Sequence, residues 1–175
     1  MGTDSAKTYA KRQRELFRTN VHRIWQMVKS GKCDELTEKE SRLAEILLSH
    51  EEYRGHFENI DILDGREYEE GMQFNPFLHI STHQMVEDQL SANQPIETVL
   101  FCEAMEDRGC AHHEAIHFII MILLHVMHAS ATGKTPFDAV RYKRLLDKCA
   151  KAEPSEIDRV IEEDFGDKTP QRNLH

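Results

Sequence analysis

The stretch HHEAIHFIIMILLHVMH, residues 112–128, places five histidines and one glutamate among residues that otherwise belong inside a protein. Its apolar side chains point nearly all round a helix, which is typical of a helix that is buried. The pattern predicts a long helix from about Cys110 to Ala131, with Gly133 as its end. His113-Glu114-x-x-His117 within it has the spacing of a zinc hydrolase helix.

Outward from this helix, almost every segment predicts another helix, and the alternation that would indicate strands is rare. Apolar residues at helical spacing predict a helix over 5–30, and a Thr37-x-x-Glu40 capping box begins the next. Asn75 and Pro76 supply the N-cap and first-turn proline of a helix that runs to about Leu90. Further helical segments are predicted at 51–59, 95–109, 135–150 and 156–164, with a loop at 61–74.

The connections are short, which favours antiparallel packing. We therefore predict an all-α, single-domain antiparallel helical bundle of about six or seven helices. The bundle domain would occupy residues 1–152, and a C-terminal helix with a flexible tail would occupy residues 153–175.

Composition limits the classes of partner. The 175-residue chain has a formal net charge of -9, which argues against nucleic acid because phosphate binding needs a basic face. The longest apolar run, Phe118–Leu124, is far shorter than the roughly 20 residues of a membrane span. The N-terminal residues lack the apolar core of a secretion signal, and the four cysteines form no CxxC pair. We therefore expect a cytoplasmic protein with reduced thiols and no membrane association.

Two helices each offer a His-x-x-x-His pair. His113 and His117 lie about 40° apart around their helix, and His79 and His83 have the same spacing on the helix that Asn75 begins. If the two helices pack face to face, four imidazoles converge, with Glu87 or Glu114 nearby. This composition is that of a transition-metal site in a bundle core, and imidazole does not choose among zinc, iron and nickel.

Two enzyme classes share parts of this pattern. In a zinc protease, Glu114 would activate the water, but a third ligand and a substrate-aligning strand are missing. Glu114-x-x-His117 is also half of a ferritin-like di-iron site, whose second half is absent. Glu114 is the one catalytic candidate, and no substrate is indicated.

A structural interpretation stands beside the metal site. Buried histidines also bond to carbonyls or to acids such as Glu87, Asp88 or Glu114. Function would then lie on a surface or at a homodimer face. His125 and His128 lie about 12 Å or more beyond His117, so the sequence assigns them to neither alternative.

The phrases NPFLHISTHQMVEDQLSANQP, HHEAIH and GKTPFDAVRY, with SHEEYR at 49–54, carry a resemblance. The chain resembles the bacterial domain-of-unknown-function family eighteen-forty-one from about Leu16 to Lys148. The resemblance implies an all-helical fold and no assigned activity. The residues that match the family's pattern are Asn75, Pro76, His79, His83, Gln89, Pro95, His113 and His117.

The chain also departs from that pattern. The family tends to have acids where Ile116, Met121 and His125 stand here, and a basic residue where Glu87 stands, with its acid at Asp88. It does not require an acid at the position of Glu114. The resemblance therefore weakens the protease interpretation and implies a changed ligand set around His125.

Overall fold

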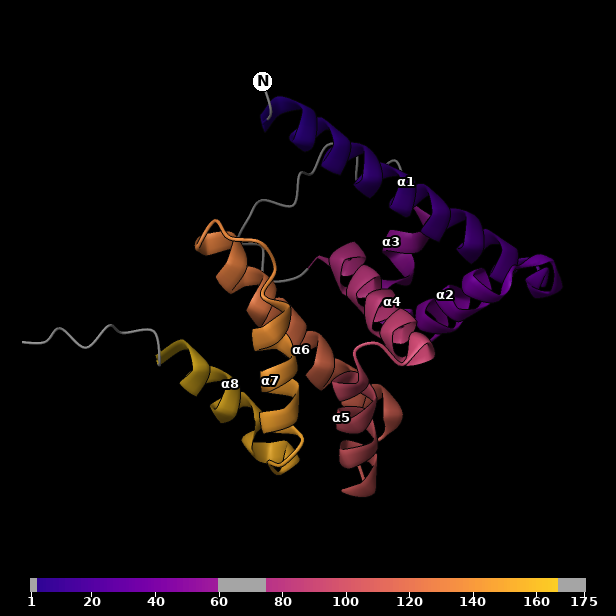
Figure 1. Cartoon of the computed structure of the whole chain (residues 1–175). Coiled ribbons are helices and arrows are strands. Elements are labelled where there is room, and N and C mark those ends of the chain that lie inside the picture. The colour runs from indigo at the N-terminus through magenta and orange to yellow at the C-terminus, as the bar shows by residue number, and fades with distance from the viewer. Residues whose placement is uncertain (1–2, 60–74, 167–175) are drawn as a thin grey trace, which may run out of the picture. The chain divides into compact units, whose positions relative to one another are not determined.

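The computed structural model describes residues 3–59 and 75–166 (Figure 1). All regular structure in these two ranges is helical, so the predicted all-α class is confirmed. The described residues contain eight α-helices, where about six or seven were predicted. They are α1 (Thr3–Lys29), α2 (Glu38–Leu48), α3 (Arg54–Glu58), α4 (Pro76–Ala92), α5 (Ile96–Asp107), α6 (His112–Thr132), α7 (Ala139–Cys149) and α8 (Ile157–Gly166).

The chain divides into two compact units, Met1–Gln84 and Met85–His175, and the boundary falls inside α4. Each unit has a hydrophobic core of its own. The predicted domain limits, 1–152 and 153–175, lie elsewhere and stay a prediction. However, α8 belongs to the second unit, because Ile157, Val160 and Ile161 are buried in its core.

In the first unit, the long helix α1 packs against α2 and α3. Val21, Ile24 and Trp25 recur at helical spacing on α1 and are buried, as the periodicity predicted. Trp25 meets Phe57 of α3 edge to face, with ring centroids 5.5 Å apart. The rest of this core is Leu43, Ala44, Ile46, Leu47, Phe77 and Ile80.

Two predicted helix caps of the first unit are present. Thr37 N donates to Glu40 Oε2 at 2.9 Å, and Glu40 N donates to Thr37 Oγ1 at 3.4 Å, which completes the capping box of α2. At α4, Asn75 Oδ1 accepts from the backbone N–H groups of Phe77 and Leu78 at 3.0 and 3.2 Å. This cap fixes the start of the helix that carries His79 and His83.

In the second unit, α6 packs against α5, α7 and α8, and Figure 1 shows α7 alongside α6 with α8 beyond it. The core is built on the apolar residues of α6, including Ile116, Ile119 and Leu123. Gly109 has a φ of 88°, which lets the chain turn sharply between α5 and α6. This turn brings the end of α5 close to the first residue of α6.

One predicted helix start was wrong. Thr135 and Pro136 were expected to begin the seventh helix, but α7 begins at Ala139. Asp138 is its N-cap, because its Oδ1 accepts from Arg141 N at 2.9 Å. The predicted loop at 61–74 lies outside the described residues, as does the predicted tail beyond Gly166.

By length and composition, α6 could cross a membrane, which no other helix of the described ranges could. Half of its apolar window is buried inside the structure. The buried core helix of a water-soluble protein passes the same test.

Candidate metal centre

Three histidines of the first unit come together. His50 lies at the end of α2, where it precedes the 3-10 turn Glu51–Tyr53, and His79 and His83 lie one turn apart on α4. The Nε2 atom of His50 is 3.0 Å from Nε2 of His79 and 3.1 Å from Nε2 of His83. One imidazole nitrogen therefore faces two others.

The tautomer of His50 follows from its other ring nitrogen. His50 Nδ1 lies 2.7 Å from the carbonyl oxygen of Ile46, which can only accept. Nδ1 therefore carries a proton, and in the neutral ring Nε2 has a lone pair directed at His79 and His83. A metal-binding histidine usually has this arrangement, with its outer N–H donated to a backbone carbonyl.

The cluster is largely shielded from solvent. His50 and His83 are each only 1% exposed, whereas His79 is partly buried. The ring of Tyr53 stacks beside His50 at 5.9 Å and meets His79 edge on at 5.7 Å. Burial raises the pKa of Tyr53, with the charge of Glu52 adding to the effect. The buried pair His50 and His83 could hold a metal ion.

Sequence reasoning missed His50. It belongs to the SHEEYR stretch that contributed to the family resemblance, but it has no His-x-x-x-His spacing. Its position after the apolar run of α2 was the available signal. Burial of a histidine next to Ile46 and Leu47 needs a polar partner, and here that partner is the Ile46 carbonyl.

The second predicted pair lies in the second unit. His113 and His117 stand one turn apart on α6, with ring centroids 4.4 Å apart. Their spacing on one helix face is as predicted, and their participation in the same ion site as His79 and His83 stays a prediction.

The two predicted acidic ligands, Glu87 and Glu114, contact groups of the second unit that are not in the histidine cluster. Glu114 Oε2 accepts from Ala111 N at 3.0 Å, which satisfies a free N–H group at the start of α6. Glu87 Oε1 lies 4.0 Å from His112 Nε2. The bond to Ala111 gives Glu114 a structural role, and its predicted role as a catalytic base stays untested.

His125 belongs to a buried charged network. Arg141 pairs with Asp164, which also accepts from Arg144 at 2.9 Å. Nε2 of His125 lies 3.3 Å from Arg141 Nη2 and 3.4 Å from Asp164 Oδ2. Burial lowers the pKa of His125, so the ring is neutral and accepts from the guanidinium, which can only donate.

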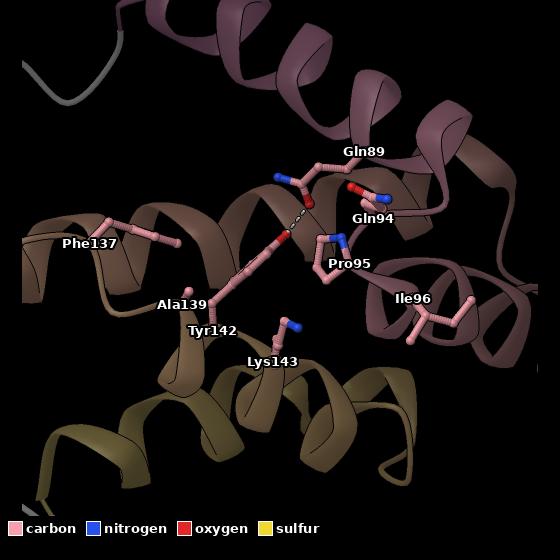
Figure 2. A pocket seen from close by; sticks show the side chains of 8 residues that line it. All are labelled: Gln89, Gln94, Pro95, Ile96, Phe137, Ala139, Tyr142 and Lys143. Carbon is pink, nitrogen blue, oxygen red and sulfur yellow. Dashed lines mark hydrogen bonds between the residues drawn. The ribbon is translucent and has the colours of Figure 1, made fainter.

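A cavity of about 490 Å³ lies elsewhere in the second unit, between α4, α5 and α7 (Figure 2). Gln89 lines the cavity and connects two of its neighbours, because Gln89 Oε1 accepts from Tyr142 Oη at 2.9 Å and from Thr98 Oγ1 at 3.0 Å. Burial raises the pKa of Tyr142 to about 12. Phe137, Pro95 and Lys143 also line the cavity.

Comparison with known proteins identifies the family. The model of the domain of unknown function DUF1841 matches residues 13–148, and the chain belongs to this family. The match agrees with the resemblance seen in the sequence and leaves Asp164 outside the matched residues. No curated protein and no solved structure matches the chain.

Proposed function

We propose that this member of the DUF1841 family binds one transition-metal ion through His50, His79 and His83. The observation behind the proposal is the position of His50 Nε2, at 3.0 and 3.1 Å from the Nε2 atoms of the other two rings. Nitrogen ligands of one ion, at about 2.0–2.1 Å from it and about 90–109° apart, are separated by about 2.9–3.4 Å. Both distances fall in that range.

Hydrogen bonding alone explains the convergence of the three Nε2 atoms less well than a shared metal ion does. The neutral His50 ring has one in-plane lone pair at Nε2, and this lone pair accepts one N–H group in good geometry. His79 and His83 both face it. An ion placed among the three rings accepts a lone pair from each, and the proton on His50 Nδ1 stays on the Ile46 carbonyl.

Imidazole donors favour zinc, iron or nickel over magnesium or calcium, which prefer oxygen. Zinc is commonly four-coordinate, so three histidines leave one position for water or a further ligand. His79 is only partly buried, and solvent can therefore reach this side of the cluster. An open position of this kind supports either hydrolysis or redox chemistry, depending on the metal.

The test is elemental analysis of native protein purified without an affinity tag, followed by metal titration. The variants His79→Gln and His83→Gln remove one ligand each while keeping a polar side chain of similar size. We expect each to weaken metal binding at least about 10-fold. His128→Gln is the matched control, because His128 is exposed on α6 and has no place in the cluster.

Two results would overturn the proposal. The first is wild-type protein that holds no ion and takes none up on titration. The second is a His83→Gln variant that binds as tightly as wild type, which would support hydrogen-bonded core histidines instead. The same assay on His113→Gln and His117→Gln tests the separate sequence prediction for that pair.

A further inference from the structure

A second group of metal-binding side chains gathers where α5 turns into α6. Cys102 and Glu106 lie one turn apart on α5, and His112 is the first residue of α6. Each offers one ligand atom, and the three atoms lie within 4.8 Å of one another. All belong to the second unit.

The separations resemble those of ligands on one ion. Cys102 Sγ is 3.6 Å from His112 Nδ1 and 3.7 Å from Glu106 Oε1. Tetrahedral zinc, with bonds of about 2.3 Å to sulfur and about 2.1 Å to nitrogen or oxygen, would hold these pairs about 3.6 Å apart. His112 Nδ1 and Glu106 Oε1, now hydrogen-bonded at 2.6 Å, would separate to about 3.4 Å. Both side chains are exposed enough to move by that amount, with 57% and 42% of their surface accessible.

The charge around Cys102 favours a cation. The carboxylates of Glu106, Glu87 and Glu103 place negative charge near Cys102. A divalent ion would neutralise these carboxylates and bind the sulfur as thiolate, with the thiol proton released to solvent.

His112 presents the nitrogen that an ion would use. Its Nδ1 donates to Glu106 Oε1 at 2.6 Å and lies 3.6 Å from Cys102 Sγ, so an ion bound there would release the Nδ1 proton to solvent. The ring would then keep its proton on Nε2, which lies 4.0 Å from Glu87 Oε1. After a small shift Glu87 would accept from Nε2 and act through His112 as a positioning residue.

We propose that Cys102 Sγ, Glu106 Oε1 and His112 Nδ1 form a second transition-metal site, selective for zinc-class ions. The thiolate gives it a softer donor set than the histidine cluster has. Three protein ligands leave a fourth position open to solvent beside the exposed His112 ring. The site stands independently of the proposed function of the histidine cluster.

Cobalt(II) titration of metal-free full-length protein, under a phosphine reductant, tests the proposal. Cobalt bound to a thiolate gives a charge-transfer band in the near ultraviolet, and cobalt bound to imidazoles alone does not. We expect saturating cobalt to produce this band, at the intensity of one cobalt–thiolate bond per chain. The Cys102→Ser variant should lose it, and the Cys110→Ser variant, which changes a nearby thiol, should keep it.

Two variants outside the core guard against misfolding, since Cys102 is buried, whereas His112 is exposed and Glu87 half-buried. His112→Gln should shift the cobalt midpoint at least about 10-fold, and Glu87→Gln about 10- to 100-fold. A wild-type protein without the band at saturating cobalt, or a band that persists in Cys102→Ser, would overturn the proposal. His83→Gln should leave the band unchanged, so failure of either metal site can be told from failure of the other.

Discussion

Replacement of Asp164 by alanine should destabilise the second unit severely. Arg141 is 4% exposed and Asp164 is 7% exposed, and the two are paired directly. Removing one partner of a buried pair leaves an uncompensated charge, which costs about 3–5 kcal/mol. With a urea dependence of about 2 kcal/mol per molar, the unfolding midpoint would fall by about 1.5–2.5 M.

Arg144 supplies the matched comparison. It also donates to Asp164, at 2.9 Å, but its side chain is 66% exposed. Solvent screens such a pair, so Arg144→Met should cost only about 0.2–1 kcal/mol. Urea unfolding followed by far-ultraviolet circular dichroism measures both variants, and hydrogen exchange of the α6–α8 amides locates the loss. An Asp164→Ala variant within about 1 kcal/mol of wild type would refute the assignment of a buried ion pair.

Three further predictions follow from pH, metal removal and a hydrogen bond. Burial lowers the pKa of His125 from 6.5, so the unfolded chain takes up a proton more readily, and stability should decline as the pH falls below 6.5. Burial alone would raise the pKa of Asp164, but the hydrogen bond and charge of Arg141 outweigh burial and lower this pKa below 3.8. A second loss of stability should therefore follow as the pH falls through the lowered pKa of Asp164. Urea unfolding at a series of pH values checks both losses, and a flat profile between pH 7 and 5 would contradict the first. A chelator should lower the melting temperature of metal-loaded protein, because an ion at 100 times its Kd stabilises the fold by about 2.7 kcal/mol. Calorimetry with and without the chelator measures the shift in melting temperature. Tyr142→Phe should lower the free energy of unfolding, measured in urea, by about 0.5–1.5 kcal/mol, because the hydrogen bond to Gln89 is lost. The variant should also lack the phenol titration expected at about pH 12.

Local signals explain why the helices could be predicted. Helical spacing on α1, the capping box of Thr37 and the Asn75 cap each act within a few residues, so the sequence displays them directly. The start of α7 was misplaced for a related reason. Pro136 resembles a first-turn proline, but the Asp138 side chain caps the helix, which begins at Ala139.

The sites depend on contacts between distant residues, which spacing does not show. His50 joins His79 and His83 from 29 and 33 residues away. Cys102 and His112 meet only because Gly109 turns the chain sharply. In the sequence, the cysteines form no CxxC pair, and the spacing of Cys102, Glu106 and His112 does not indicate a shared site.

The two proposed sites differ in how far their histidine is fixed before an ion arrives. The outer nitrogen of His50 lies 2.7 Å from Ile46 O, which holds the ring with its inner nitrogen directed at the other donors. Such an outer partner reduces the conformational entropy that is lost on binding. Glu87 Oε1 is 4.0 Å from His112 Nε2, so this partner would have to approach when an ion binds. The net charge of -9 also raises the local concentration of cations around the protein. A histidine held only for packing needs a partner for its outer nitrogen, but it does not need further donor atoms gathered at its inner one.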